Sequence, residues 1–286
     1  MRVLFYTVLG LLLALSHTAQ ADRFANVQVE ATELAPNLYM LTGAGGNMAA
    51  LVGNDGILLI DAQFAGMADK IQAKLHQLGE GQSLKLLINT HFHGDHVGAN
   101  AAFAEQARIV AHDNVRVRLA ADSNFPVSGL PDTTFNDRLV LHKNGQTIHV
   151  QAMQASHTDG DVIIWFEQAN VLHTGDLMFE GRFPFIDTNA GGNLHAYIEN
   201  TQLMIEKINE QTQVIPGHGQ LTNQAGLKRE LAMMKATLAL VQQHKDNGLS
   251  EQAIIEQGLG DEWLDWHWNF ITEERWIRTL YQALAK

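Results

Sequence analysis

The sequence predicts an α/β protein, because stretches with the pattern of strands alternate with stretches of helical spacing. Both halves of the chain follow the same order, several strands and then mixed strands and helices, although no residues repeat between them. The chain has 286 residues and a hydrophobic content of 46%, enough to bury a large core. We therefore expect a globular, enzyme-sized unit.

The first half begins with a meander of short strands, separated by turn sequences such as GAGG and GNDG. Runs of β-branched and aliphatic residues predict these strands at residues 27–30, 38–42, 48–52 and 57–61. The pattern then predicts a helix at 65–78, a strand at 84–89, a helix near 99–106, a strand at 108–111 and a short helix near 114–120.

The second half opens with residues 121–137, which show neither the spacing of a helix nor the alternation of a strand. This stretch holds Pro126 and Pro131. A long loop is expected there, of the kind that often closes over a site. Strands are predicted at 138–142, 147–153, 161–166 and 170–173, a helix at 194–209 and a short strand at 213–215. The tail from residue 224 has helical spacing, and we expect its four tryptophans to pack in the core: Trp263, Trp266, Trp268 and Trp276.

Residues 1–21 have the composition of a signal peptide. Arg2 precedes an apolar stretch at residues 3–15, and Ala19-Gln20-Ala21 is a small-x-small cleavage pattern. The apolar stretch is shorter than the roughly 20 residues that span a bilayer, which favours cleavage over a retained membrane anchor. The mature chain, residues 22–286, is therefore expected to begin at Asp22 and to be periplasmic or secreted.

Charge and cysteine content restrict the class of partner. The formal net charge is −12 without clustered Lys and Arg, which argues against nucleic acid and favours a small-molecule substrate. The chain has no cysteine, so disulfides cannot stabilise it even in an oxidising compartment. Stability must come from the core and from any metal that the chain binds.

The sequence NTHFHGDHVGAN, residues 89–100, gathers ligand-type side chains directly after the apolar run at 84–88. His91 and His93 are two residues apart, so an extended chain would direct both toward one ion. Asp95 and His96 come further along the turn and would be directed elsewhere. Neutral imidazole and carboxylate are suitable ligands for zinc.

Three more ligand-type residues stand beside glycine at the ends of predicted strands. His157 lies in SHTDGD, Asp176 in HTGDLMF and His218 in VIPGHG. Loops at strand ends are where rigid scaffolds commonly carry their functional side chains. We therefore expect these residues to complete one metal site.

In the order of these motifs the chain resembles the metallo-β-lactamase superfamily of metal-dependent hydrolases. The matching positions are His91, His93, Asp95 and His96 in the first motif, then His157, Asp176 and His218. The resemblance covers essentially the whole mature chain, including GILLIDAQF and AHDNVR. It implies a four-layer αβ/βα sandwich with the site at one edge of two sheets, followed by a helical tail.

The resemblance also implies two ions per chain, with zinc as the default metal. Carried over by position, His91, His93 and His157 would bind the first ion. Asp95, His96 and His218 would bind the second, and Asp176 would touch or bridge both. Two cations about 3.5–4 Å apart lower the pKa of a shared water from 15.7 toward about 7, which yields a hydroxide nucleophile. Asp95 would act catalytically by orienting that hydroxide with its second oxygen.

The substrate is less well defined by the sequence. No cysteine followed by lysine occurs in Asp176-Leu177-Met178-Phe179, which separates the chain from one group of antibiotic-hydrolysing enzymes. The ligand set resembles the glyoxalase II-like branch, yet a signal peptide and the missing basic glutathione-binding residues argue against glyoxalase II. Cleavage of an amide or ester-like bond is expected, with a β-lactam as first candidate and a lactone or thioester as alternative.

Two other classes of function fit the sequence less well. A metal-binding protein without turnover has no need of Asp95 and Asp176 beside a full histidine set. An oxygen-reducing di-iron protein would carry an acidic residue at the position of His93 and an added electron-transfer domain.

Several further residues have a structural and a functional interpretation. Arg182 is the candidate to hold a substrate carboxylate, and Asn193 either lies near the substrate carbonyl or caps a helix. Asp61 either forms a turn or orients a metal-bound histidine from behind. His112 and His173 are expected to be structural. The GAGGN sequence at 43–47 and the loop at 121–137 are candidates to flank the substrate.

Overall fold

The protein is described by a computed structural model over residues 23–285. The predicted signal peptide, residues 1–21, and the predicted first mature residue, Asp22, lie outside these described residues. Within residues 23–285, no helix combines the length and the apolar character that crossing a membrane requires.

The first sheet has seven strands in the order β1-β2-β3-β4-β5-β6-β7. Pairs from β1 to β4 are antiparallel, and pairs from β4 to β7 are parallel. The strands are β1 (Glu30–Ala35), β2 (Leu38–Thr42), β3 (Met48–Leu51), β4 (Ile57–Ile60), β5 (Leu84–Ile88), β6 (Arg108–His112) and β7 (Thr133–Phe135).

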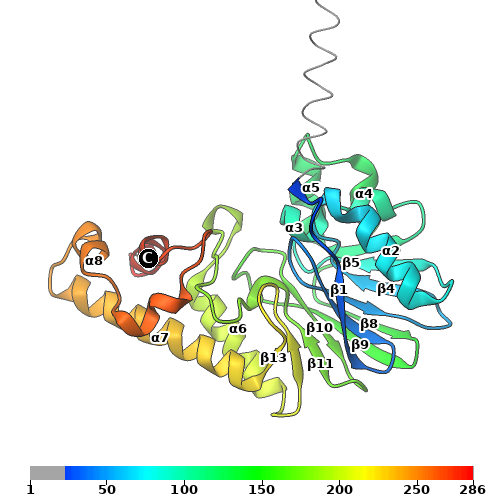
Figure 1. Ribbon diagram of the computed structural model, residues 1–286. Coiled ribbons are helices and arrows are strands. Elements are labelled where there is room, and N and C mark those ends of the chain that lie inside the picture. Colours follow the sequence, from blue (N-terminus) through cyan, green and yellow to red (C-terminus); the bar gives the residue numbers. More distant parts are fainter. Residues whose placement is uncertain (1–22, 286) are drawn as a thin grey trace, which may run out of the picture.

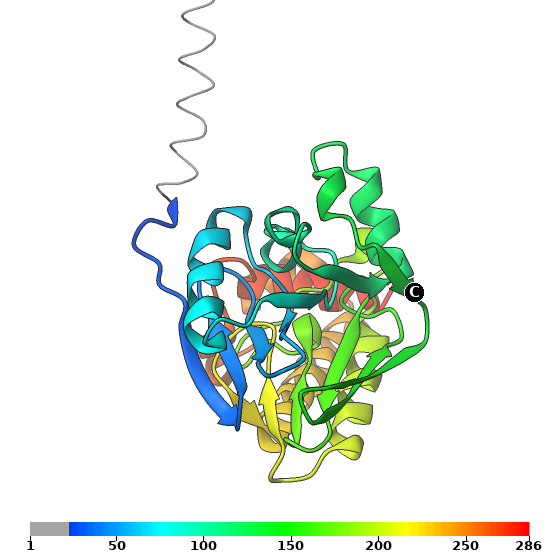
Figure 2. The ribbon, with the colours of Figure 1, turned by 90° about the vertical axis from the view of Figure 1, so that its right-hand side faces the viewer.

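The second sheet has six strands in the order β13-β12-β11-β10-β9-β8, of which only the β11–β12 pair is parallel. The strands are β8 (Arg138–Lys143), β9 (Gln146–Ala152), β10 (Val162–Phe166), β11 (Val171–His173), β12 (Gln213–Ile215) and β13 (Thr222–Asn223). Figure 2 shows the strands in front of the C-terminal helices, coloured orange and red.

Helices lie on the outer side of each sheet. The α-helices are α2 (Ala68–Gly79), α3 (Gly94–Val97), α4 (Asn100–Phe103), α5 (Asp113–Ala121), α6 (Leu194–Lys207), α7 (Gln224–Asp246), α8 (Glu251–Gln257) and α9 (Glu273–Ala283). The 3₁₀ turns are η1 (Ala65–Met67), η2 (Val127–Gly129), η3 (Gly175–Leu177), η4 (Thr188–Ala190) and η5 (Asp261–Trp266). In Figure 1, α2 and α7 lie at opposite sides of the molecule with the strands between them.

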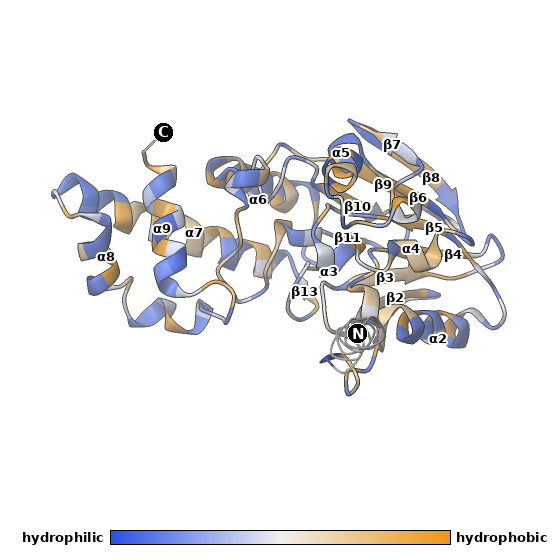
Figure 3. Ribbon diagram, turned by 90° about the horizontal axis from the view of Figure 1, so that it is seen from above, coloured by the Kyte–Doolittle hydropathy of each residue, from blue (hydrophilic) through white to orange (hydrophobic). Residues whose placement is uncertain are grey.

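Alternation along the strands explains the layers. In β4, Leu58 and Ile60 pack into the core between the two sheets, whereas Ile57 and Leu59 pack toward α2. In β10, Ile164 faces the inter-sheet core and Ile163 faces the helices α6 and α7. Successive side chains of a strand point to opposite faces, so strands covered on both sides are apolar throughout. Figure 3 shows this apolar character along β3, β4 and β5. The four-layer αβ/βα sandwich is confirmed.

Three expectations about the elements are corrected. The first strand is β1 at Glu30–Ala35 and not 27–30, because a turn at Pro36 and Asn37 joins it to β2 and Asn37 adopts a φ of 65°. The stretch 121–137 is not all loop, since β7 pairs in parallel with β6 at the sheet edge. The helix expected near 99–106 is limited to α4.

The four tryptophans of the C-terminal tail are buried to different extents. Trp276 is fully buried in the core shared by α6, α7 and α9, as predicted. Trp263, Trp266 and Trp268 are only partly buried, and Trp268 lines a cavity. A core position is therefore confirmed for Trp276, whereas Trp263, Trp266 and Trp268 pack against that core and stay partly exposed.

Candidate metal centre

The predicted ligands come from loops that follow strands at one edge of the two sheets. His91 and His93 follow β5, His157 lies between β9 and β10, Asp176 lies in η3 after β11, and His218 follows β12. His93 has extended backbone angles and directly precedes α3, so Asp95 and His96 lie on the first turn of that helix. The change from strand to helix turns the second pair away from the first, as the spacing predicted.

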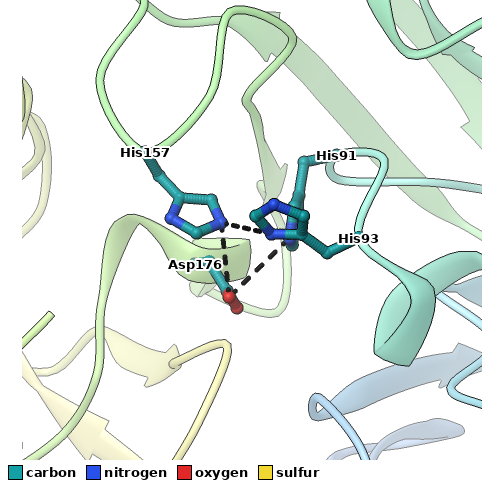
Figure 4. Close-up of side chains that lie close together, drawn as sticks. All are labelled: His91, His93, His157 and Asp176. Carbon is teal, nitrogen blue, oxygen red and sulfur yellow. Dashed lines mark hydrogen bonds and ion pairs between the residues drawn. The ribbon is translucent and has the colours of Figure 1, made fainter. Parts of the chain in front are cut away.

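The first ligand group consists of His91, His93, His157 and Asp176, whose ligand atoms lie within 4.8 Å of one another. Nδ1 of His93 is 3.1 Å from Nε2 of His91 and 2.9 Å from Nε2 of His157. Oδ2 of Asp176 is 3.7 Å and 3.5 Å from the same two Nε2 atoms. Figure 4 shows the four side chains converging on a common point.

The second ligand group consists of Asp95, His96 and His218, also within 4.8 Å. Oδ2 of Asp95 is 3.3 Å from Nε2 of His218 and 3.7 Å from Nε2 of His96. The other oxygen of Asp176, Oδ1, lies 3.0 Å from Nε2 of His96 and 3.5 Å from Nε2 of His218. Asp176 therefore directs one oxygen to each group, and the chain brings all seven predicted ligands together.

The donor set fits divalent cations. Ligands about 2.0–2.1 Å from a tetrahedral ion are separated by about 3.3 Å, close to the spacings within both groups. Nε2 of His96 and Oδ1 of Asp176 are buried and have no hydrogen-bond partner among the described residues, although only 3.0 Å separates them. Buried polar atoms without a partner are costly, and a cation between these two atoms would satisfy both.

Each histidine of the first group is fixed through its other ring nitrogen. Nδ1 of His157 lies 2.7 Å from the carbonyl oxygen of Phe185, and Nδ1 of His91 lies 3.0 Å from Oγ1 of Thr90. Nε2 of His93 lies 3.0 Å from Oδ2 of Asp187. Such outer contacts set the tautomer and the ring orientation of a metal-binding histidine.

In the second group, Asp61 has the orienting role that the sequence predicted. Its Oδ2 lies 2.8 Å from Nδ1 of His96, and both side chains are fully buried. Thr90 donates from its backbone amide and its hydroxyl to the two oxygens of Asp61. Asp61 has a φ of 61°, a strained value that this network holds in place.

The pKa values differ between the two groups. Burial lowers the pKa of His157 to about 4 and that of His91 well below its ordinary value, so the first group offers neutral imidazoles. Burial acts in the same direction on His96 and His218, but nearby carboxylates outweigh it. The pKa of His96 is raised well above its ordinary value, and that of His218 to about 9, chiefly by Asp176. Without a cation, the second group therefore holds protons.

Glycines let the GAGGN turn approach the ligands closely. A Cβ on Gly46 would lie 2.1 Å from the ring of His96, and one on Gly45 would lie 2.6 Å from the carbonyl oxygen of Asp95. His173 donates from Nε2 to the carbonyl oxygen of Asn47, while its Nδ1 accepts from the amide of Gly175. His173 is therefore a structural residue, as predicted, and it supports this turn.

A cavity of about 820 Å³ opens beside the two ligand groups. The ligands His93, Asp95, Asp176 and His218 line this cavity, together with Gly43, Ala44, Gly45 and Asn47 of the GAGGN turn. Arg182 lines it, as expected of a residue that holds a substrate carboxylate. The aromatic residues Phe64, Phe179, Phe185, Trp268 and Phe270 line it as well.

Two predicted substrate contacts, Asn193 and the stretch 121–137, do not line this cavity. Asn193 does not line this cavity, and its Oδ1 accepts from the amide of Ala196 at the start of α6, which agrees with the capping interpretation. The stretch 121–137 contributes no residue to the cavity either, since its residues line a separate hollow with Ile109 and Arg116. His112 caps α5, as expected of a structural residue.

Sequence reasoning missed Asp187 and the aromatic residues of the cavity. Asp187 stands 94 residues after His93, in a stretch without a ligand-like motif. Trp268 and Phe270 were regarded only as part of a helical tail. One signal was present, because Phe185 and Asp187 are close in sequence to Arg182, which was already a candidate.

Comparisons with known proteins agree with the fold. The family model of the metallo-beta-lactamase superfamily matches residues 41–218. A metallo-beta-lactamase type 2 of Bacillus sp. (strain 170) is 21% identical over 218 residues, which cover 72% of this chain and 82% of that protein. A hydroxyacylglutathione hydrolase of Polaromonas sp. (strain JS666 / ATCC BAA-500) is 26% identical over 148 residues, half of this chain and 52% of that protein.

One relative is named as a subunit of a demethylase and not as a lactamase or hydrolase. The 2,4-dinitroanisole O-demethylase subunit alpha of Nocardioides sp. (strain JS1661) is 24% identical over 195 residues. The match covers 66% of this chain but only 57% of that protein. Among solved structures, a metallo-beta-lactamase from Pontibacter korlensis has a TM-score of 0.64 and 20% identity, covering 73% of this chain and 99% of that one.

Fold and site together define an enzyme that hydrolyses its substrate with the help of metal ions. The chain belongs to the metallo-β-lactamase superfamily, whose family model spans more than half of it.

Proposed function

We propose that this chain is an exported hydrolase that binds two zinc ions and cleaves an amide or ester-like bond in a small molecule. The observation that carries the proposal is the position of Asp176, whose Oδ2 faces His91 and His157 while its Oδ1 faces His96 and His218. A site for a single ion has no use for a carboxylate shared between two ligand groups. The proposal of export is based on the composition of residues 1–21.

When bound, two divalent cations would acidify a shared water and polarise the substrate carbonyl. Asp95 is the carboxylate of the second group that reaches the cavity, with 24% of its side chain exposed. It accepts a hydrogen bond from the attacking water and so orients it toward the carbonyl carbon. The water oxygen joins that carbon, and the bond from the carbon to the leaving atom breaks, which is carbon–nitrogen in a β-lactam, carbon–oxygen in a lactone and carbon–sulfur in a thioester. The proton of the water passes to the leaving atom. Because the chain has no cysteine, this chemistry uses no thiol nucleophile.

A β-lactam is the first substrate class to test, and a lactone or thioester is the second. The similarity to a metallo-beta-lactamase type 2 supports the first class, and the similarity to a hydroxyacylglutathione hydrolase supports a thioester. Export supports the β-lactam, whose carboxylate needs a cation nearby. Arg182 meets this need, because it lines the cavity and forms no ion pair with any residue in 23–285.

Turnover of a substrate panel by the zinc-loaded mature chain tests the proposal. The panel contains a penicillin, a cephalosporin, a carbapenem, a lactone and a thioester. We expect hydrolysis of at least one class, and its loss in His93→Ala with an unchanged far-UV circular dichroism spectrum. His149→Ala is the control, because His149 lies on β9 and pairs with Glu167 away from the cavity. Wild-type turnover by His93→Ala would show that the site is wrongly assigned.

Arg182→Ala separates a β-lactam from the other classes. We expect modest β-lactamase activity in which the variant raises KM more than it lowers kcat, because binding of the carboxylate is lost equally in the ground and transition states. Arg108→Ala, an exposed arginine that pairs with Asp132, is the control. Efficient β-lactam hydrolysis that ignores Arg182→Ala would place the carboxylate elsewhere. No hydrolysis of all three β-lactams would favour a lactone or thioester.

A further inference from the structure

A continuous series of aromatic rings joins the two ligand groups along one side of the cavity. We call its four members, Phe179, Phe185, Trp268 and Phe270, the aromatic wall. At one end Phe179 stacks on His218, with ring centroids 5.2 Å apart and planes 10° apart. At the other end Phe185 stacks on His93, with centroids 5.6 Å apart.

Trp268 and Phe270 close the series between these two ends. The ring of Trp268 lies 5.9 Å from that of Phe179 and 5.5 Å from that of Phe270. Phe270 in turn meets Phe185 edge to face at 5.1 Å. These spacings are the ones that aromatic pairs prefer. The wall therefore runs from a ligand of one group to a ligand of the other without interruption.

Hydrogen bonds hold the tail segment in this place. The indole nitrogen of Trp268 donates to the carbonyl oxygen of Phe183 at 3.0 Å, and the amide of Phe183 donates to the carbonyl oxygen of Trp266 at 2.8 Å. The amide of Trp268 donates to the carbonyl oxygen of Ile271 at 3.0 Å. The wall is thus set in position before any substrate arrives, and a ligand loses little entropy in ordering it.

The wall also leaves apolar surface uncovered. Phe270 is 47% exposed although it is a large apolar side chain, and it faces the cavity. Arg182 lies over the ring of Trp268, with 5.4 Å from Cζ to the centroid, and Arg275 lies over Phe270 at 4.4 Å. The two guanidinium groups cover part of these rings, and the exposed part of Phe270 is available to a ligand.

We propose that the aromatic wall binds an aromatic group attached next to the scissile carbonyl, so that the enzyme prefers substrates with aryl-substituted acyl groups. This inference rests on the proposed hydrolytic function. Because Phe185 stacks on His93 and Phe179 stacks on His218, a ring that lies against the wall would have its carbonyl near the metal ligands. Trp268 and Phe270 are then specificity-determining residues supplied by the tail.

Paired substrates that differ only in the acyl group test this inference. On a penicillin scaffold the pair is benzylpenicillin, which carries a phenylacetamido group on the carbon next to the scissile lactam carbonyl, and the analogue with an acetamido group at that carbon. On a thioester scaffold it is the phenylacetyl and acetyl thioesters of N-acetylcysteamine. Burying one aromatic ring changes kcat/KM by about 10- to 100-fold. We expect zinc-loaded wild-type protein to prefer the aryl member by that factor.

Variants of the wall should reduce this preference. Phe270→Ala and Trp268→Ala are expected to bring the ratio of kcat/KM within each pair close to one, and Trp268→Phe to keep most of it because a ring remains. Trp263→Ala is the control, since Trp263 packs against Trp266 and does not line the cavity. A wild-type enzyme without the preference, or one whose preference survives Phe270→Ala and Trp268→Ala, would overturn the inference while leaving the hydrolytic function intact.

A binding measurement decides the inference independently of turnover. Isothermal titration of the zinc-loaded protein compares phenylacetate with acetate, which share the carboxylate and differ in the ring. We expect phenylacetate to bind at least about 10-fold more tightly, and Phe270→Ala to remove the difference. Absence of turnover on every scaffold would end the proposed function, and equal binding of the two acids would end the inference.

Discussion

Asp187 shows how much of the site depends on single residues outside the ligand set. Its Oδ2 contacts Nε2 of His93, and its Oδ1 accepts hydrogen bonds from the amides of Asn189 and Ala190 in η4. The carboxylate of Asp187 thus fixes the ligand His93 and also caps the 3₁₀ turn η4.

We predict that Asp187→Asn lowers zinc affinity by about 10- to 100-fold, the range typical of outer contacts of metal-bound histidines. Asn keeps an oxygen for the two amides of η4 but loses the anionic partner of His93. Competition with a chromogenic chelator measures the affinity. Asp159→Asn, which breaks the pair with Arg118, is the control. Equal affinities in Asp187→Asn and wild-type protein would refute the orienting role.

Glu230 is a second residue whose chemistry is set by burial. It lies on α7, is 1% exposed, and accepts hydrogen bonds from the amide of Phe179 and the hydroxyl of Tyr197. Its Oε2 has no partner among residues 23–285. Burial raises the pKa of this carboxyl well above its ordinary value, so the folded chain keeps a proton that the unfolded chain releases near pH 4.5.

The raised pKa of Glu230 makes the free energy of unfolding depend on pH. Since the folded state binds more protons, the contribution of Glu230 to the free energy of unfolding falls as pH rises above about 4.5, by up to about 1.4 kcal/mol per pH unit. Glu230→Gln removes this term. We predict that the variant gains stability relative to wild type between about pH 5 and pH 8, measured by urea unfolding at both values. Glu199→Gln, exposed on α6, is the control, and a difference that does not change with pH would contradict the assignment.

At the scale of elements, the N-terminus of α6 shows which of two predicted roles Asn193 has. Asn193 was a candidate both for the substrate carbonyl and for the helix cap, and its side chain accepts from the amide of Ala196. We predict that Asn193→Ala lowers the free energy of unfolding by about 1 kcal/mol, the usual cost of losing such a cap. Metal content and KM should stay at wild-type values. A raised KM without a loss of stability would reverse this assignment.

The elements that the sequence predicted well are those with strong local patterns. The strands β2, β4, β5 and β10 are mostly apolar and mostly buried, and turns with glycine or asparagine mark their ends. β7 could not be predicted, because its three residues, Thr133–Phe135, show little pattern and form a strand only by pairing with the edge of β6. β1 was misplaced because three of the six residues in its sequence EATELA are polar and none of the six is buried at the sheet edge.

Local sequence patterns also decide which residues of the site could be predicted. The ligands could be predicted because each lies in a short motif at a strand end, and their order matches one superfamily. Asp61 could be predicted because it closes the buried strand β4. Trp268 could not, since its place depends on a hydrogen bond to Phe183, 85 residues earlier in the chain. Contacts between distant segments carry no local signature, so side chains behind and around the ligands are known only from the fold.

At the scale of the whole molecule, the layers bring four separate loops to one sheet edge. The core between the sheets fixes β5 and β11 relative to each other, and the outer core fixes the C-terminal helices against the second sheet. Each ligand group thereby receives residues from both halves of the chain. The tail adds Trp268 and Phe270 to the aromatic wall, and Arg182 supplies positive charge near the cavity of a chain with net charge −12. An anionic substrate would meet few other cations there.

The central claim is that the chain holds two metal ions, one in each ligand group. Elemental analysis of the purified mature protein after dialysis against zinc tests this most directly. Two groups that share Asp176 exceed what one tetrahedral ion can use, so we predict close to two zinc ions per chain. Asp176→Ala should reduce this number, because it removes a ligand from both groups. A single ion per chain, even with zinc in excess, would contradict the account.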